Sequence, residues 1–466
     1  METIITDLLC IGAGLAGERV AVEAASAGFD ALCLSIVPPR RSHSSAAQGG
    51  MQAALGNCFK GEGDSPDVHF QDTVKGSDWG CDQEVARLFT ETAPIAVREM
   101  AFWGIPWNRV VPGQSTYFKG GKQFEKVEPA ANQGLITARD FGGTAKWRTC
   151  YTSDGAGHTL LYTMDNKVVE LGVRVHDRME AISLIHDGEK CTGVVARCLK
   201  TGQLRIYLAK ATLIATGGYG RIYRETTNGG DGGTLLDVNE ERFMDKYEPE
   251  KAELASRDVV SRWMTHHIRK GLGVKSPYGD HLWLDIRHLG AQHIKTKLRE
   301  VEEICNNFLG VDPITQLIPV RPAQHYTMAG VRTNKDGAAY GLKGLFSAGE
   351  AACWDMHGFN RLGGNSLAET IVAGKIVGGK VVEFLQGYEV AFDTAVTRAT
   401  LLKDRERIDR LIHCRDGKEN VFEVRNAMQD ELMDHVGIFR NGKDLQTAVD
   451  NLQEIYGRAQ QVGLRS

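Results

Sequence analysis

The hydrophobic positions near the N-terminus form two short apolar runs with a helical pattern between them. Ile4–Ile11 is apolar almost throughout, which is typical of a parallel strand covered on both faces. Residues 18–27 then have the spacing of a helix that ends at Gly28, and 31–34 is a second apolar run. This order predicts a strand–helix–strand unit at the start of an α/β domain.

A glycine motif joins the first predicted strand to the helix. Gly12, Gly14 and Gly17 have the GxGxxG spacing, which permits a tight turn and the approach of a pyrophosphate to the helix N-terminus. Because the motif lies between a strand and a helix, it predicts a dinucleotide site that includes Ala16. Ser35 stands where an acidic residue would bind a ribose. A serine cannot reject a 2′-phosphate by charge, so a nicotinamide site is less favoured.

Between Gly172 and Gly218 the pattern of apolar positions changes to alternation. Alternation predicts strands with one covered face, and Asp-Gly and Thr-Gly pairs predict the turns between them. The expected strands are residues 181–185, 191–197 and 204–208, followed by a separate buried strand at 212–215. This last strand ends in a glycine turn at Ala215, Thr216, Gly217 and Gly218.

The C-terminal part of the chain has helical patterns. Residues 366–382 are apolar nearly all round, which predicts a buried helix. After residue 387 the composition changes, and three amphipathic helices are expected at 394–412, 419–435 and 443–462. A separate helical domain is therefore predicted there.

Composition narrows the class of protein. The chain has 466 residues, so two or three domains are expected, and 42% of the residues are hydrophobic, which suits a large core. The formal net charge of -4 gives no argument for nucleic acid or for a charged membrane surface. No apolar run has the length of a membrane span, and the stretch before the first strand is too short and acidic for a signal peptide.

The ten cysteines are scattered, and no two have CxxC spacing. This spacing argues against a zinc site or an iron–sulfur cluster in the chain. We expect most of the thiols to be small buried hydrophobic groups in a reducing compartment.

Several motifs are far more specific than the glycine turn. The most specific are Arg41-Ser42-His43-Ser44 with Ala47-Gln48-Gly49-Gly50 behind it, and the run His357–Ser366. Others are Thr73–Trp79, Arg139–Gly143, Gln324–Gly330 and Gly344–Glu350. Together they resemble the flavoprotein subunits of the succinate dehydrogenase and fumarate reductase family. The resemblance is closest to bacterial quinol:fumarate reductases of the dihaem cytochrome b type.

The resemblance implies an FAD cofactor, covalently bound through His43. It also implies an α/β fold: a Rossmann-like FAD domain of the two-dinucleotide-binding type, an inserted α+β capping domain and a C-terminal helical domain. The other residues expected at the FAD are Gly12, Gly14, Ala16, Gly17, Ser35, Arg41, Ser42, Ser44, Gln48, Gly49, Gly50, Asp78, Ala215, Thr216, Gly217, Gly218, Glu350, Asn365, Ser366 and Leu367.

For catalysis the resemblance implies a hydride transfer at flavin N5 between succinate and fumarate. Arg361 and His325 would hold the substrate carboxylates, because arginine grips a carboxylate through two parallel hydrogen bonds. Arg257 would deliver the proton. The plainer interpretation of Arg257 is an arginine on a helix surface, paired with Asp258 or Glu253.

The implied partners are an iron–sulfur subunit and, through it, a membrane cytochrome b subunit. The expected location is peripheral, on the cytoplasmic side of the bacterial inner membrane. No nucleic-acid partner is expected. We expect four segments: a first part of the FAD domain at 1–228, a capping domain at 229–322, a second part of the FAD domain at 323–386, and the helical domain at 387–466.

The sequence departs from the family after Asn228, where the His-Pro-Thr and Thr-Glu-Gly motifs of the capping domain are missing. The stop at Ser466 is a second departure. Two other hypotheses therefore stay open. The chain is also similar to L-aspartate oxidase, although His43 counts against that enzyme. Alternatively, it is a flavin-holding protein without catalysis.

Overall fold

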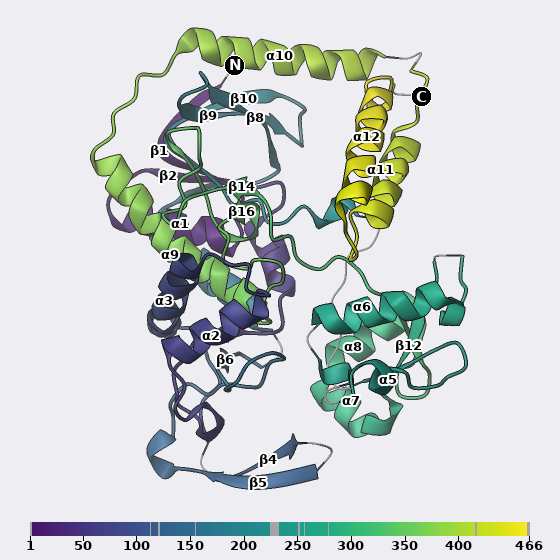
Figure 1. Cartoon of the computed structure of the whole chain (residues 1–466). Helices are drawn as coiled ribbons and strands as arrows, with labels where there is room; N and C mark the ends of the chain where they lie inside the picture. The colour runs from purple at the N-terminus through teal and green to yellow at the C-terminus, as the bar shows by residue number, and fades with distance from the viewer. Residues whose placement is uncertain are drawn as a thin grey trace. The chain divides into compact units, whose positions relative to one another are not determined.

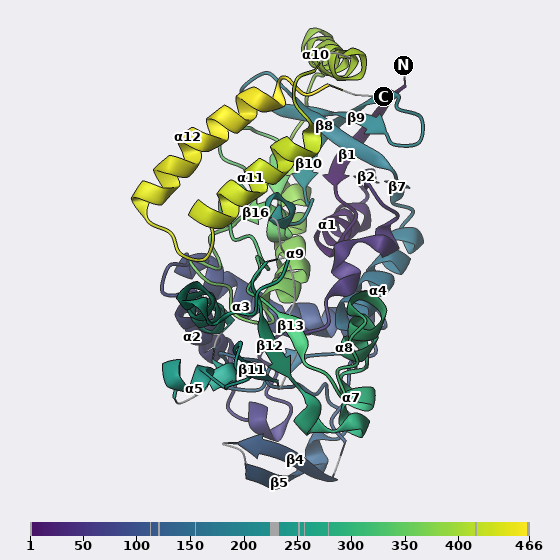
Figure 2. The same cartoon turned by 90° about the vertical axis from the view of Figure 1, so that its right-hand side faces the viewer.

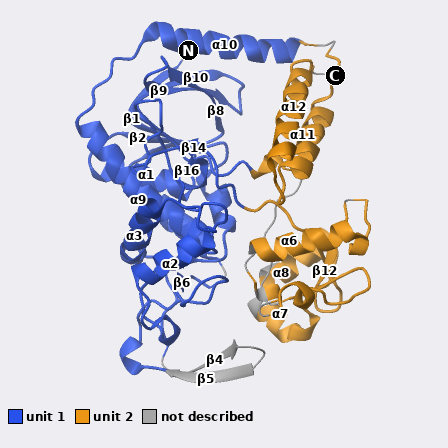
Figure 3. Cartoon of the chain, viewed as in Figure 1, with its two compact units in different colours: residues 1–219, 326–413 blue, residues 220–325, 414–466 orange. Residues whose placement is uncertain are grey.

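The fold comes from a computed structural model. It describes residues 2–111, 113–119, 122–153, 155–223, 233–249, 252–255, 257–277, 279–414 and 417–463. Figure 3 colours two compact units: the first unit comprises residues 1–219 and 326–413, and the second comprises 220–325 and 414–466.

The first unit is built on a seven-stranded sheet. Its strands are β1 (Thr3–Ile11), β2 (Ala31–Leu34), β7 (Arg174–His176), β8 (Met179–His186), β9 (Cys191–Cys198), β10 (Leu204–Ile214) and β15 (Leu345–Ser347). The order is β7-β2-β1-β10-β9-β8, and β15 also pairs with β10. Strands β7, β2, β1, β10 and β15 pair in parallel, whereas β8 and β9 continue the sheet antiparallel. The predicted parallel strands and the predicted meander thus form a single continuous sheet.

Strand β10 differs from the expectation of two separate strands. It runs without interruption from Leu204 to Ile214. Its first half pairs antiparallel with β9, and Ile206–Ile214 pairs in parallel with β1. The intervening Ala-Lys-Ala has no turn residue, so nothing in the sequence breaks the extended backbone there.

Alternate residues of β1 enter different cores, as the all-apolar run predicts. Leu8 and Cys10 pack in a cluster with helices α1 (Leu15–Ser26) and α9 (Asn365–Gln386). Leu9 and Ile11 pack on the other side with residues of β2 and the meander.

Helix α9 runs past α1, as Figures 1 and 2 show, and two glycines permit the close approach. A Cβ atom at Gly374 would lie 2.7 Å from Arg19 Cβ, and one at Gly378 would lie 2.7 Å from Glu23 Cβ.

The remaining helices of the first unit are α2 (Pro66–Gly76), α3 (Gln83–Phe102), α4 (Ala156–Glu170) and α10 (Thr394–His413). Its short strand pairs are β3 (Met51–Gln52) with β6 (Thr149–Cys150), β4 (Gly113–Lys119) with β5 (Lys122–Glu128), and β14 (Val331–Arg332) with β16 (Ala352–Cys353).

The second unit contains a three-stranded antiparallel sheet. Its strands are β11 (Thr234–Leu236), β12 (Leu282–Asp285) and β13 (Ile318–Val320). The helices of this unit are α5 (Met244–Tyr247), α6 (Arg257–His267), α7 (Ala291–Lys297), α8 (Arg299–Ile304), α11 (Val421–His435) and α12 (Gly442–Ala459).

One histidine of α6 is more buried than its sequence suggests. We expect the adjacent His266 and His267 to be solvated, but His267 is only 3% exposed. Its ring stacks on Phe243 at 4.1 Å, and its Nδ1 lies 3.0 Å from the Tyr247 hydroxyl. The expectation is wrong for His267 because it lies on the inward face of the helix.

The ten cysteines are free thiols, and eight of them are buried, which confirms the expectation for most of them. Within the described part of the chain, no group of three His, Cys, Asp or Glu side chains is arranged to hold a metal. No helix among the described residues is long and apolar enough to cross a membrane.

Candidate functional site

The glycine turn after β1 is packed so closely that side chains are excluded from it. Gly12 has a φ of 113°, and a Cβ there would lie 2.2 Å from the Ala215 carbonyl oxygen. A Cβ at Gly17 would lie 1.9 Å from the Gly12 carbonyl oxygen. The turn therefore brings the ends of β1 and β10 together at the start of α1, with Ala16 buried in its first turn.

The N-terminus of α1 has no side-chain cap at Gly14. The Ser42 and Ser44 hydroxyl oxygens lie 2.9 and 3.2 Å from a Cβ position at Gly14, and the Leu15 N–H donates to Ser44 Oγ at 3.3 Å. The loop that carries His43 thus lies directly against this helix end. Helix N–H groups and the helix dipole favour an anion here, so the arrangement fits the pyrophosphate of FAD.

His43 begins a short 3₁₀ helix, His43–Ala46, and is exposed, as is Arg41 before it. Helix α4 packs against this loop. The Gly157 N–H donates to the Ala47 carbonyl at 2.7 Å, and a Cβ at Gly157 would lie 2.2 Å from the Ser44 carbonyl oxygen. The backbone of the loop is therefore held while the imidazole faces outward.

Residues 48–50 are held by an arginine that is absent from the predicted site. Arg139 donates to the carbonyls of Gln48 at 2.7 Å and Gly49 at 2.6 Å. The nearby Phe141 ring would lie 2.9 Å from a Cβ at Gly49 and 2.5 Å from one at Gly363. Phe141 therefore brings together the loop behind His43 and the loop after Arg361.

The predicted FAD residues at the start of α9 are fixed from α2. The Asn365 amide oxygen lies 3.0 Å from His69 Nε2, and its nitrogen donates to Thr73 Oγ1 at 3.1 Å. Burial lowers the pKa of His69 to about 3, and the charge of Arg148 acts in the same direction. His69 is thus neutral and donates through Nε2. Ser366 and Leu367 follow in the first turn of the helix.

The glycine turn after β10 lies against a half-buried glutamate, Glu350. Thr216, Gly217 and Gly218 are exposed, and a Cβ at Gly218 would lie 2.2 Å from Glu350 Oε1. Glu350 accepts hydrogen bonds from the Thr327 N–H at 2.9 Å and hydroxyl at 3.1 Å. Burial raises the pKa of its carboxyl group.

Two further predicted residues lie at loop positions. Ser35 is buried at the end of β2, where its N–H donates to the His176 carbonyl at 3.0 Å. Asp78 follows α2 with a φ of 56°, in the left-handed region.

The residues predicted to act on substrate belong to different units. Arg361 lies in the first unit, between β16 and α9. His325 is exposed in the second unit. Arg257 begins α6 in the second unit, and its side chain lies outside the described part of the structure.

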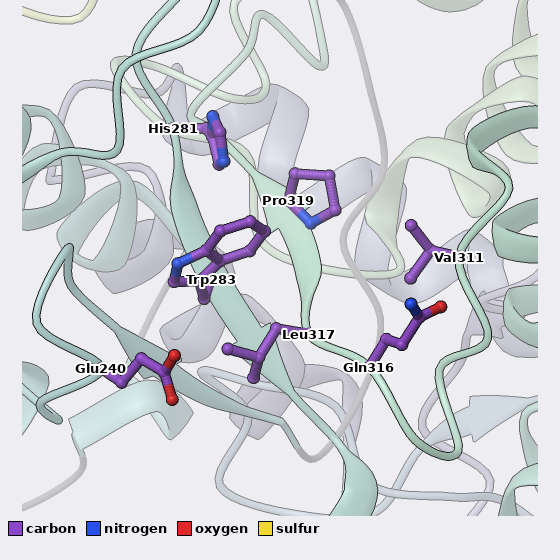
Figure 4. Close-up of a pocket in the computed structure, with 7 residues that line it drawn as sticks. All are labelled: Glu240, His281, Trp283, Val311, Gln316, Leu317 and Pro319. Atoms are coloured by element: carbon purple, nitrogen blue, oxygen red, sulfur yellow. The ribbon is translucent and has the colours of Figure 1, made fainter.

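A separate pocket lies at β12 and β13 in the second unit. Figure 4 shows its lining, which includes Trp283, Pro319 and His281, and its volume is about 500 Å³. Burial lowers the pKa of His281. None of the residues that the sequence motifs select lines this pocket. The residues that the motifs select for FAD lie in the first unit instead.

Comparisons with known proteins identify the family of the chain. A family described as "FAD binding domain" matches residues 7–229 and 227–367, and one described as "Fumarate reductase flavoprotein C-term" matches residues 425–466. The fumarate reductase flavoprotein subunit of Helicobacter pylori (strain ATCC 700392 / 26695) is 44% identical, over the whole chain and 75% of the relative. The chain belongs to the fumarate reductase and succinate dehydrogenase flavoprotein family.

Other family members confirm the resemblance stated from the motifs. The succinate dehydrogenase flavoprotein subunit of Rickettsia bellii is 34% identical over 96% of the chain and 81% of the relative. A solved mutant of E. coli quinol fumarate reductase has a TM-score of 0.86 and 31% identity, and covers 99% of this chain and 84% of the other. A quinol-fumarate reductase with menaquinol molecules has a TM-score of 0.88 and 30% identity. The predicted fold class is confirmed, and the FAD-domain match supports the predicted FAD cofactor.

The comparisons also bear on the segment missing after Asn228. The alignment to the Helicobacter relative spans 537 positions, more than the 466 residues of this flavoprotein. The FAD-domain match is broken into two pieces that meet at residues 227–229. Relatives therefore carry residues, within the aligned region, that this chain lacks.

Proposed function

We propose that this flavoprotein is the catalytic subunit of a membrane-bound quinol:fumarate reductase or succinate dehydrogenase. Its FAD would be linked covalently to His43. One observation carries the proposal: the exposed His43 lies in a loop whose serines lie against the N-terminus of α1, where Ser44 Oγ accepts from the Leu15 N–H. A dinucleotide held at that helix end extends toward the loop. The exposed imidazole is then available for a bond to the flavin.

The substrate we propose is the fumarate/succinate pair. Bound FAD supplies the hydride exchange with the carbon–carbon bond of the substrate. Arg361 binds a carboxylate by paired, charge-assisted hydrogen bonds, and His325 adds a donor. Arg257 supplies the proton. Support for these roles comes from the family motifs around the three residues.

The partners we propose are an iron–sulfur subunit and, beyond it, a membrane cytochrome b subunit. The chain would then be peripheral, on the cytoplasmic side of the bacterial inner membrane. Support comes from relatives of the chain, since the solved E. coli and menaquinol-containing structures are named quinol fumarate reductases.

The first test is the mass of the denatured chain, isolated from its host. We expect the mass to exceed that of the unmodified polypeptide by one FAD, with flavin fluorescence that stays with the chain in acid. An unmodified mass would contradict the covalent link. A mass several kilodaltons higher would mean that the natural chain carries the capping segment after Asn228.

The second test separates an enzyme from a flavin-holding protein, which the break at residues 227–229 would favour. We expect the purified complex to reduce a dye with succinate as electron donor. A chain that carries covalent flavin but neither oxidises succinate nor reduces fumarate would support the flavin-holding protein.

A further inference from the structure

Three side chains that none of the motif-based assignments uses form a network in the first unit. Tyr326 donates its hydroxyl proton to Glu369 Oε2, and His357 Nε2 lies 3.0 Å from the same oxygen. The tyrosine hydroxyl and His357 Nε2 are 3.3 Å apart, and the two rings meet edge to face at 5.2 Å. One carboxylate oxygen therefore fixes both rings.

Glu369 and His357 are shielded from water, and Tyr326 is partly buried. Glu369 is 2% exposed on α9, and His357 is 6% exposed in the loop before that helix. Burial, together with the charges of Glu369 and Glu350, raises the pKa of Tyr326 well above 10. The tyrosine thus stays protonated and acts as a donor. A buried carboxylate is costly unless donors satisfy it, so this arrangement constrains the rings strongly.

Arg361 lies on the face of the constrained tyrosine. Its guanidinium carbon is 4.6 Å from the centre of the Tyr326 ring, within the range of a cation–π interaction. The guanidinium also donates to the Leu362 carbonyl at 3.2 Å. A long arginine has several rotatable bonds, and its grip on a carboxylate needs one orientation of the planar fork. The ring supplies a flat surface for that fork.

The pKa shifts of the neighbouring groups also link Arg361 to Tyr326. The positive charge of Arg361 opposes the raised pKa values of both Tyr326 and Glu350, so all three groups share one electrostatic environment. Replacing Glu369 by glutamine would weaken the field on the guanidinium and leave the tyrosine hydroxyl with a neutral acceptor in place of a charged one. Both changes alter Arg361 without touching a substrate.

We propose that Tyr326, His357 and Glu369 are positioning residues that orient the Arg361 guanidinium for a substrate carboxylate. The inference rests on the proposed role of Arg361 and extends it to residues that do not contact substrate. A purely structural network would stabilise the start of α9 and leave dicarboxylate affinity unchanged.

The experiment measures malonate binding to the purified flavin-loaded complex, through the change in flavin absorbance. Malonate carries two carboxylates on a single methylene carbon and has no CH–CH bond that the flavin could oxidise, so the readout does not need turnover. In Glu369→Gln we expect the dissociation constant to rise about tenfold or more. In Tyr326→Phe the ring remains, so we expect a smaller rise of a few-fold, with flavin content unchanged.

Matched controls have the same chemistry at exposed positions. Glu383→Gln lies on the same helix, where Glu383 pairs only at the surface with Lys380. Tyr340→Phe changes a tyrosine that is 65% exposed. Both controls should leave the malonate dissociation constant within twofold of the unmodified complex.

A double-mutant cycle with Arg361→Gln decides between the explanations. If Glu369 acts through Arg361, Glu369→Gln will add little once Arg361 is already glutamine. Full additivity would overturn the inference, as would a Glu369→Gln affinity equal to that of the controls. If Arg361→Gln itself leaves malonate affinity unchanged, the proposed role of Arg361 fails, which is a separate outcome.

Discussion

Helices α1 and α9 of the first unit begin in similar ways and are built by different means. Each starts after a glycine, Gly14 or Gly364, which has no side chain of its own to cap the helix. At α1 the backbone itself closes the site, because Gly12 and Gly17 leave no room for side chains. At α9 a buried amide, Asn365, is held by two polar side chains of α2. The residues at the start of α1 are therefore constrained by the space available, and Asn365 at the start of α9 is constrained by hydrogen bonds.

The difference between the two helix N-termini matches the groups that are proposed to bind at each. A pyrophosphate is an anion without fine directional needs, and free backbone N–H groups suffice for it. In the proposed function a substrate carboxylate next to the flavin must be oriented, and Arg361, which lies on the Tyr326 ring in the loop before α9, would do this. Substitutions at the two ends should therefore fail in different ways.

The largest effect is expected from Gly17→Ala at α1. A Cβ there would lie 1.9 Å from a backbone oxygen, so the turn must open, at a cost of about 3 kcal/mol. Thermal unfolding and flavin absorbance should both show a loss. The control is Gly379→Ala on α9, which meets no atom within 4 Å and should be neutral or slightly stabilising. Normal flavin content in Gly17→Ala would mean that FAD binding does not depend on the close packing of the turn at α1.

Arg361→Gln should act on catalysis alone. Loss of two charge-assisted hydrogen bonds predicts a fall of about 100-fold or more in kcat/KM for fumarate, with flavin content unchanged. The control Arg332→Gln changes an arginine whose side chain is 70% exposed and should stay near normal activity. If Arg361→Gln also loses its flavin, then flavin binding and substrate binding cannot be assigned separately to the two helix ends.

His43→Ser sharpens the assignment at α1. We expect FAD to remain bound at the helix end but to be released by acid, with succinate oxidation reduced more than fumarate reduction. In-gel flavin fluorescence under denaturing conditions is the measurement. His186→Ser, at an exposed histidine of the same unit, should keep its flavin attached. Fluorescence that persists in His43→Ser would place the link at another residue.

The smallest effect concerns His69, which holds Asn365. Its pKa in the folded state is about 3, below its ordinary value of 6.5, so the unfolded chain binds the extra proton first as the pH falls. Stability is therefore full above pH 6.5 and decreases toward pH 3, by up to about 1.4 kcal/mol per pH unit. His69→Gln retains a donor and should reduce that slope. Denaturant unfolding at pH 7.5 and 5.5 measures it, and equal slopes in both proteins would contradict the buried neutral histidine.

The contrast between the helix ends also explains what sequence reasoning reached. The turn at Gly12–Gly17 is local, so spacing between a strand and a helix was enough to predict it. The partners of Asn365 lie almost 300 residues earlier in the chain. His69 is a polar residue on an amphipathic helix, which by pattern alone favours the surface.

The same limit applies to residues in recognised motifs. Arg139 and Phe141 stand in a motif that the sequence singles out, but their contacts with Gln48, Gly49 and Gly363 depend on tertiary packing. His267 is buried although its neighbour pattern favours solvent. Local spacing predicts which loops matter, and only the fold identifies the side chains that hold them.

The pairing of β1 with β10 sets an order for synthesis of the chain on the ribosome. Thr3 and Ile206 are register partners, so the first strand waits for about 200 further residues before its central neighbour exists. At about 5–20 residues per second this delay lasts on the order of ten to forty seconds. Helix α9, which packs on α1, emerges later still. The first strand therefore stays without its neighbour β10 until residues 206–214 have been synthesised.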